Sequence, residues 1–554
     1  MLTEVLLGIL LILLLWKAIL KKPAGLPPGR WGLPLIGYIP LTRKSMEEQL
    51  DDLNKEHGDI YVWRMGTQVM VFLHSYEMCK EAFARQEFTH RPDWLFFNPS
   101  NEKVALGVGG SNGPHWHTNR RFTLRQLKNQ GMGKSTLVSG IHEQANMLIG
   151  KFQEQAGKSA AVPYAIRVAV VNVIWHMVAS ITYDVDDPKL KEFMQLMDDF
   201  GEMTYYSTFL DIFPWLRNIP AFLKNRLFAL DQVEITDQKF MNYFYEVIKE
   251  HKSSLDPENP RDLIDSYLLD TEGMEQEEVI RSDKDLALLI FDLFFAGSET
   301  TYSTLTFAMY YLAAFPEAQR KLQEEIDRAL PGDVLPTLED RASLPYLEAV
   351  LHEVLRMTSL VPGGVQHCAS RDTHFAGYTI PKGSIINTAA ASIHYDSRYW
   401  DRPESFFPER WLDEEGKFCA KKEGFLPFGV GKRVCLGESL ARMELFILAV
   451  AVFKNFTISP PPGTPSTRRS TQPDPADVPR AKEVRILRNL RVRKLKMKIE
   501  EACMTIWIMV EDLRMKKIEE PETVELFEDE DSLLFDKYFV RKEAVVMGKL
   551  VEDL

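Results

Sequence analysis

The sequence is poor in cysteine, and its few cysteines are not arranged in pairs. Five are scattered along 554 residues, no C-x-x-C pair occurs, and their number is odd. Disulfide-stabilised secreted domains and zinc sites both depend on paired or closely spaced cysteines. Neither class is therefore indicated, and a reducing compartment fits the folded part of the chain best.

Basic charge is also scarce, since 66 Lys and Arg stand against 79 Asp and Glu and the formal net charge is −13. A protein that follows nucleic-acid phosphates needs a broad basic surface, so nucleic acid is not expected as a partner. Part of the acidity is local, because residues 511–536 hold eleven acidic and three basic residues, a net of −8. Apolar residues are plentiful, at 45% of the chain, and suffice for a large core.

One long aliphatic run stands at the N-terminus. Leu2 to Leu20 contains few polar residues, and a helix of that length just spans about 30 Å of hydrocarbon. A cleaved signal peptide is the alternative, but no A-x-A-like site follows, and the next residues are Lys21, Lys22 and a Pro-rich stretch. We therefore predict a membrane anchor over 1–22 and a hinge over 23–45, with the rest of the chain on the cytosolic side.

Hydrophobic periodicity predicts a mainly α domain with small β-sheets over residues 46–490. A hairpin is expected between Gly58 and Leu73, and a second strand-rich region between Phe375 and Ile393. The expected long helices cover roughly 130–156, 186–205, 232–254, 284–315, 317–330, 344–357 and 439–453. The apolar connection 209–223 is either core or a surface patch that dips into a membrane.

The strongest chemical signal is a glycine-rich loop around Cys435, just before a helix-forming run. Glycines at 429, 431 and 437 let backbone N–H groups approach the sulfur, and the start of the following helix adds positive partial charge. These features stabilise a thiolate, which is a soft ligand suited to iron. In haem enzymes such a ligand favours O–O cleavage.

This loop resembles the signature of the cytochrome P-450 (haem-thiolate monooxygenase) superfamily, through Phe428, Gly431, Arg433, Cys435 and Gly437. Two more segments agree in order. The E-x-x-R motif is Glu353 to Arg356, whose spacing puts both charges on one helix face. The segment Phe407 to Trp411 carries Arg410, which by resemblance completes an E-R-R structural network.

The resemblance also implies the groups that hold the haem. Cys435 is the expected iron ligand, and Phe428 and Gly429 belong to its loop. Trp116 and Arg120 match a W-x-x-x-R motif and, with His367 and Arg433, are expected to bind the two propionates through charge-assisted bonds. The sequence leaves open whether Arg121 supports Arg120.

A further motif interrupts the apolar helix expected over 286–312. Ala296, Gly297, Ser298, Glu299 and Thr300 lower helix propensity there, and Ser or Thr hydroxyls can bond back to the preceding turn. Such a local opening can hold water or dioxygen. An acid beside a hydroxyl can relay protons, so by resemblance Thr300 orients protons toward dioxygen and Glu299 supplies them.

The residues of the segments 297–301, 360–367 and 131–134 are most similar to those of the microsomal, animal family-two-like branch. That resemblance implies a monooxygenase that uses haem b, O₂ and NADPH-derived electrons, and that lies in the endoplasmic reticulum membrane. The implied partners are a flavoprotein reductase and cytochrome b5. Arg121, Lys421, Lys422 and Lys432 could form a basic face for an acidic partner or merely solvate a loop.

By resemblance, residues 94–97, Phe291, Phe294 and Phe295, and residues 360–365 are expected to line an apolar pocket for a lipophilic substrate. Two alternatives stay open: a haem-thiolate isomerase or dehydratase that acts on peroxides, and a non-catalytic haem- or lipid-binding membrane protein. The charged tail 491–554 is foreign to the family pattern. It is either an appended regulatory segment or a product of how the coding sequence is assembled.

Overall fold

The computed structural model describes residues 22–39, 42, 44–98, 104–155, 162–228, 230–270 and 279–460. The anchor predicted over 1–22 and the tail over 491–554 lie outside these residues. No helix among the described residues is both long and apolar enough to cross a bilayer.

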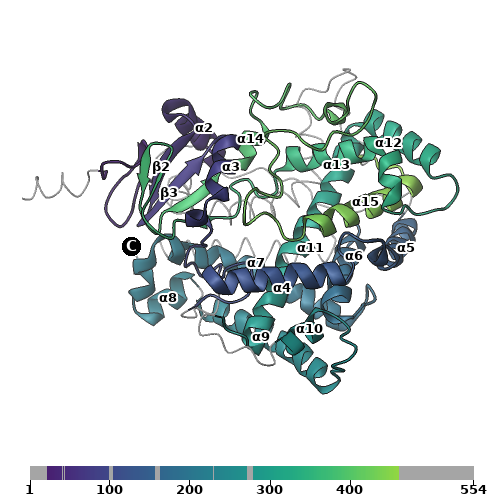
Figure 1. Cartoon of the computed structure of the whole chain (residues 1–554), viewed down its shortest axis with the longest axis horizontal. Coiled ribbons are helices and arrows are strands. Elements are labelled where there is room, and N and C mark those ends of the chain that lie inside the picture. Colours follow the sequence, from purple (N-terminus) through teal and green to yellow (C-terminus); the bar gives the residue numbers. More distant parts are fainter. Residues whose placement is uncertain are drawn as a thin grey trace, which may run out of the picture.

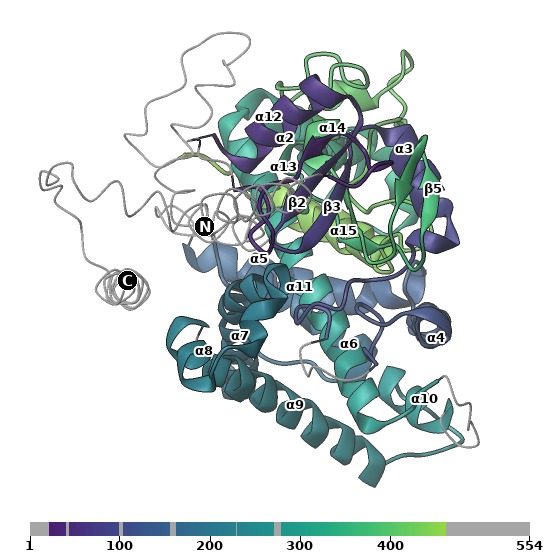
Figure 2. The ribbon, with the colours of Figure 1, turned by 90° about the vertical axis from the view of Figure 1, so that its left-hand side faces the viewer.

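Helices form most of the molecule, and the strands gather on one side, as Figures 1 and 2 show. The helices are α2 Met46–His57, α3 Tyr76–Ala84, α4 Gly113–Asn129, α5 Val138–Gln155, α6 Ala165–Ala179, α7 Pro188–Ile212, α8 Ala221–Phe228, α9 Leu230–Ser253, α10 Leu263–Asp270, α11 Asp283–Ala314, α12 Pro316–Ala329, α13 Pro345–Thr358, α14 Ala390–His394 and α15 Glu438–Asn455. The strands are β1 Gly29–Arg30, β2 Ile60–Met65, β3 Gln68–Leu73, β4 His367–Cys368, β5 Thr373–Phe375, β6 Tyr378–Ile380 and β7 Ile385–Thr388. The predicted mainly helical class with small sheets is confirmed.

The larger sheet joins segments that are far apart in the chain, in the order β1-β2-β3-β7-β4. The predicted hairpin is β2 and β3, which pair from Ile60 with Leu73 to Met65 with Gln68. Gly66 adopts φ of +55° in its tight turn. Strand β7 runs parallel to β3 and antiparallel to β4, and β4 therefore brings His367 to the sheet.

Helix α11 is the central element of the helical part. Ser282 caps its first turn by accepting a hydrogen bond from the Asp285 N–H. The helix packs against α6, α9, α13 and α15, and Figure 2 shows it between the sheet-bearing half and helices α7 to α9. Its motif residues therefore lie in the middle of the molecule.

The expected boundaries of two helices needed correction. The helix predicted to begin near residue 130 begins at Val138, because Gly131 and Gly133 adopt positive φ and interrupt the chain before it. The helix predicted to end at 205 continues to Ile212. Within the apolar connection 209–223, Leu210 and Ile212 are buried, whereas no residue of the 3₁₀ turn Pro214–Asn218 is buried.

Candidate active site

The loop around Cys435 is held in a compact turn by its own backbone. The Cys435 N–H donates to the Phe428 carbonyl at 2.9 Å. Gly431 has φ of +85°, and a Cβ there would lie 2.3 Å from the Phe83 carbonyl oxygen, so only glycine allows this close approach to α3. The next residue, Lys432, donates its N–H to the same carbonyl.

The Cys435 side chain is exposed although it lies deep in the fold. Burial raises the pKa of its thiol, and hydrogen bonds from the N–H groups of Gly437 and Glu438 at the start of α15 oppose that shift. The Cys435 side chain is thus surrounded by protein and yet accessible to solvent. Its sulfur can therefore meet a ligand.

Two residues of α11 are also exposed, although their helix packs against α6, α9, α13 and α15. Ala296 and Thr300 are open, one turn apart, and the Thr300 hydroxyl donates to the Ala296 carbonyl at 2.8 Å. The helix continues through the motif without a break, and Thr300 makes the expected backward hydrogen bond. Gly297 instead faces α6, where an added Cβ would lie 2.8 Å from Ile174 Cδ1.

Glu299 points to an arginine of a neighbouring helix. Arg167 of α6 contacts Glu299 at 3.1 Å and also holds Asp198 of α7 through both terminal nitrogens, at 2.6 and 3.2 Å. The Glu299 carboxylate is therefore ion-paired, while the neighbouring Thr300 hydroxyl bonds to its own helix.

Three arginines come together near Cys435, although only Arg120 and Arg433 were predicted there. Arg433 donates to the Thr89 and Ser111 carbonyls at 2.8 and 2.6 Å, and Arg120 donates to the Val434 carbonyl at 2.6 Å. Arg91 donates to the carbonyls of residues 365 and 366. We call Arg91, Arg120 and Arg433, with Trp116 and His367, the arginine cluster.

The positive charges of the three arginines in this cluster repel one another. Burial lowers the pKa of Arg433, the positive charges of Arg91 and Arg120 add to this shift, and the negative charge of Asp292 opposes it. Burial likewise lowers the pKa of Arg91 to about 9. A guanidinium keeps its proton in proteins, so the cluster favours an anion. Among the described residues, these three arginines donate to backbone carbonyls and to Asn112 and form no ion pair with a carboxylate.

The aromatic members complete the donor set. The Arg433 guanidinium lies 3.9 Å from the centre of the Trp116 ring, and the buried Trp116 Nε1 finds no hydrogen-bond acceptor in the described part of the chain. The His367 Nδ1 lies 2.6 Å from the Phe88 carbonyl oxygen, and this hydrogen bond does not involve Nε2. Buried cations and a free indole N–H near an uncovered cysteine fit a flat cofactor that carries carboxylates. The residues present therefore fit haem.

A second arginine group surrounds Glu353 in the interior of α13. Arg356 donates to both Glu353 oxygens at 2.8 and 3.0 Å, and Arg410 donates to one at 3.0 Å. The Trp411 indole donates to the other oxygen at 3.0 Å. The structure thus brings together the three residues that the sequence assigned to a structural network.

Aromatic side chains form one wall beside α11. Phe295 lies 5.9 Å from Phe96 and 5.5 Å from Phe200, between ring centres, so the segment 94–97 and α7 meet this helix. Phe291 stacks on Phe295 at 5.6 Å. The prediction that Phe294 lines the pocket is wrong, because Phe294 is fully buried and packs on Trp175 at 4.3 Å.

Sequence reasoning missed two charged residues at this site. Arg91 precedes a proline in a loop outside the quoted motifs, so nothing in the sequence pointed to it. Asp292 accepts hydrogen bonds from the Val108 and Gly109 N–H groups, both at 2.7 Å, and burial raises its pKa to about 6. A single acid in an apolar helix was the signal that could have found it.

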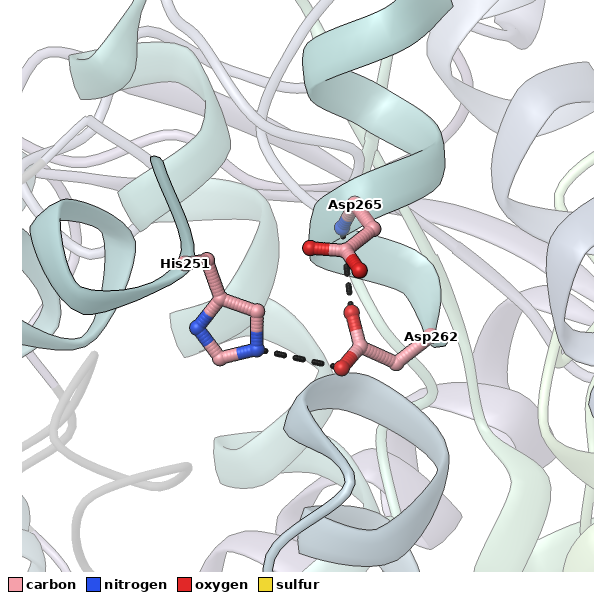
Figure 3. Close-up of side chains that lie close together, drawn as sticks. All are labelled: His251, Asp262 and Asp265. Atoms are coloured by element: carbon pink, nitrogen blue, oxygen red, sulfur yellow. Dashed lines mark hydrogen bonds and ion pairs between the residues drawn. The ribbon is translucent and has the colours of Figure 1, made fainter. Parts of the chain in front are cut away.

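Within the described residues, a further group of ligand-type side chains lies close together, namely His251, Asp262 and Asp265 (Figure 3). His251 Nε2 lies 3.0 Å from Asp262 Oδ2, and Nδ1 lies 2.8 Å from the Val247 carbonyl. Because both neighbours are acceptors, both nitrogens carry protons. Burial opposes this charge, but the hydrogen bonds to Asp262 and Val247 outweigh it and raise the pKa of His251. The group is therefore an internal ion pair that joins α9 to α10.

Comparison with known proteins gives a consistent result. The family model described as "Cytochrome P450" matches residues 27–483. "Cytochrome P450 2L1" of Panulirus argus is 42% identical over 451 residues, which cover 80% of this chain and 90% of that protein. "Cytochrome P450 18a1" of Drosophila melanogaster is 36% identical over 79% of the chain and 82% of its own length. "Cytochrome P450 2E1" of Oryctolagus cuniculus is 36% identical, over 83% and 92% respectively.

Proposed function

The chain belongs to the cytochrome P450 family and is a haem-dependent monooxygenase, and on that premise we propose which residues carry out each part of its reaction. The observation that carries the assignment is the arginine cluster beside the uncovered Cys435. The relatives favour this activity over the peroxide isomerase and the non-catalytic binding protein.

Cys435 is the proposed thiolate ligand of the haem b iron. Arg91, Arg120, Arg433, Trp116 and His367 are the proposed partners of the propionates. Support comes from burial, because four of them are buried and Arg120 is partly buried, and from the absence of an ion pair with a carboxylate for the three arginines among the described residues. Bound haem supplies the site where dioxygen is activated.

Thr300 and Glu299 are the proposed proton relay. The Thr300 hydroxyl is exposed on the inner face of α11, where Ala296 leaves room beside it, and it can pass a proton at Oγ1. Glu299 would receive protons from solvent near α6 and α7, because its ion pair with Arg167 keeps its carboxylate directed toward these helices. The proposed relay would connect Thr300 on the inner face of α11 with the partly buried ion pair of Arg167 and Glu299.

Replacing Thr300 tests this assignment. Thr300→Ala is expected to keep haem and to consume NADPH, but with a smaller share of the electrons ending in product and a larger share in hydrogen peroxide. The matched control is Thr304→Ala, because Thr304 is a buried threonine one turn further along α11. Equal coupling in the two variants would remove Thr300 from the relay.

The substrate is a lipophilic small molecule, according to our proposal. Phe96, Phe291 and Phe295 supply an apolar, aromatic wall, and Phe200 of α7 packs on the last two. Val365 is 45% exposed and lies two residues from His367, which supports its place on the same wall.

We further propose that the enzyme lies on the endoplasmic reticulum membrane, anchored by residues 1–22 with its catalytic domain in the cytosol. An exposed apolar patch on the described part supports a second contact with the bilayer. Leu33, Leu35, Ile36 and Trp215 are each at least 40% exposed, and the Trp215 indole donates to the Leu35 carbonyl. Deleting residues 1–22 is expected to weaken membrane retention without loss of haem. Combining the deletion with Leu35→Ser and Trp215→Ser is expected to release the protein.

An NADPH-dependent flavoprotein reductase is the proposed electron donor, with cytochrome b5 as a second partner. Arg121 and Lys432 are exposed near the Cys435 loop, and Lys421 is exposed in the segment before it. Electrostatic attraction to an acidic partner falls steeply with ionic strength. Reversing these charges is therefore expected to slow reduction of the haem by the reductase and not by dithionite.

A further inference from the structure

Arg442 of α15 connects the Cys435 loop with helix α13. Its Nε donates to Glu438 Oε1 at 2.9 Å, and its Nη1 lies 2.7 Å from His352 Nε2. Its guanidinium also lies 4.8 Å from the centre of the Phe428 ring. Only 22% of the side chain is exposed, so these three contacts fix its position.

The contact with His352 has a defined direction. His352 Nδ1 lies 2.7 Å from the Glu348 carbonyl and so carries the proton, which leaves Nε2 as an acceptor for Arg442. Burial lowers the pKa of His352 to about 3, and the charge of Arg442 adds to this shift. His352 is therefore neutral, and removing Arg442 would leave a buried nitrogen without a partner.

The other two contacts flank Cys435. Phe428 provides the carbonyl that accepts the Cys435 N–H, and Glu438 stands at the first position of α15, where its N–H is directed at the sulfur. The Glu438 carboxylate thus adds a negative charge beside a thiolate. Arg442 places a positive charge against that carboxylate and packs on the ring of Phe428.

We propose that Arg442 is a positioning residue that cancels the charge of Glu438 beside the Cys435 sulfur and fixes Phe428 at the base of its loop. This inference rests on the proposed role of Cys435 as the haem ligand. A negative charge near the haem disfavours the addition of an electron, and a positive charge favours it. The pair is partly exposed, so solvent screening makes the effect modest.

The midpoint potential of the haem tests the proposal, measured by reductive titration with dithionite and mediator dyes in the absence of reductase. Glu438→Gln is expected to raise the potential, and Arg442→Gln is expected to lower it. The double variant is expected to return close to the unmutated value. Arg442→Lys keeps the charge, so it is expected to keep the potential but to lower the melting temperature, because lysine lacks the fork that reaches His352 and Glu438 together.

The controls are Arg320→Gln and Glu324→Gln, which break an i,i+4 ion pair on the surface of α12 and are expected to leave the potential unchanged. Shifts of the same sign in the two single variants, or no shift in either, would overturn the proposal. So would an Arg442→Gln variant that slows electron transfer from the reductase at an unchanged potential, because Arg442 would then act in docking.

The proposal stays testable if Arg442→Gln does not fold, because Glu438→Gln and Arg442→Lys still have to show a raised and an unchanged potential. The reduced, carbon monoxide-bound spectrum of each variant reports whether a thiolate remains bound to iron. If the unmutated protein lacked the thiolate-type Soret band, the assignment of Cys435 would fail rather than the role of Arg442.

Discussion

The two buried arginine groups of this enzyme differ in what balances their charge. Around Glu353, the chain itself supplies the carboxylate, and both oxygens are occupied by Arg356, Arg410 and Trp411. In the arginine cluster, the guanidiniums of Arg91 and Arg433 reach backbone carbonyls instead. A carbonyl carries only a partial charge, so it cannot neutralise a buried cation as a carboxylate does. The first group is a closed ion-pair network, and we propose that the second binds a ligand with acidic groups.

The largest expected effect comes from breaking the ion-pair network around Glu353. Glu353→Gln leaves two buried guanidiniums without their counter-charge, and loss of one partner of a buried ion pair costs about 3–5 kcal/mol. We expect little soluble protein and rapid proteolysis. The control is Glu409→Gln, whose half-exposed pair with Lys321 contributes at most about 1 kcal/mol. A soluble Glu353→Gln variant with normal haem content would contradict the scaffold role.

The second effect separates binding from folding. Arg433→Gln removes a cation from a cluster in which no arginine is ion-paired with a carboxylate among the described residues, so the polypeptide is expected to stay folded while its haem content falls several-fold. Arg121→Gln is the control, because the neighbouring Arg121 is exposed. Haem content relative to protein, with circular dichroism for the fold, measures both. Loss of helical signal together with haem would place Arg433 in the scaffold instead.

A third effect tests whether pairing inside the chain is enough to stabilise a buried cation. His251 is protonated by its contacts with Asp262 and Val247, and its pKa is raised in the folded state. Its contribution is therefore complete below the unfolded pKa of about 6.5 and is lost as pH rises through the higher folded pKa. His251→Gln is expected to lower stability by about 1.5–3 kcal/mol at acidic pH, as for a charged hydrogen bond, and less at alkaline pH. The test is a set of melting curves of both proteins across this pH range. A stability difference between the unmutated protein and His251→Gln that does not change with pH would contradict the proposed ion pair.

The smallest effect concerns the ion pair of Arg167 with Glu299 and Asp198. Asp198 is 49% exposed, so the network is screened and its loss is expected to change stability by less than about 1 kcal/mol. Arg167→Gln is expected instead to alter the solvent isotope effect on turnover, because Glu299 is released from its partner. Asp198→Asn leaves Arg167 entirely to Glu299 and is expected to shift the isotope effect the opposite way. Shifts in the same direction would remove Arg167 from the control of proton supply.

The same comparison explains what the sequence could predict. The Cys435 loop, the hairpin and α11 follow from local chemistry, since glycine positions, alternation and caps are visible in neighbouring residues. The network around Glu353 was anticipated because its members carry motifs. Arg91 was not, because its position depends on the distant carbonyls of residues 365 and 366.

The two longest helices that the sequence did not predict, α4 and α6, were missed for a related reason. In α6, 13 of 15 residues are buried, so no polar face gives the 3.6-residue period on which helix prediction depends. In α4, buried polar side chains such as His115 and Asn119 obscure the pattern, because they bind Asp285 of α11 and not solvent. The same tertiary packing buries Phe294 against Trp175 of α6, although the resemblance implied that Phe294 lines the pocket. Burial on all sides, which arises only when elements assemble, is what the sequence pattern does not encode.

The central claim is that Cys435 provides a thiolate to haem iron. Its most direct test is the reduced, carbon monoxide-bound difference spectrum of membranes that contain the full chain, recorded beside Cys435→Ala and beside Cys419→Ala as a matched control. We expect the thiolate-type Soret band in the unmutated protein and in Cys419→Ala, and its loss in Cys435→Ala. The same band in Cys435→Ala, or none in the unmutated protein, would contradict the assignment.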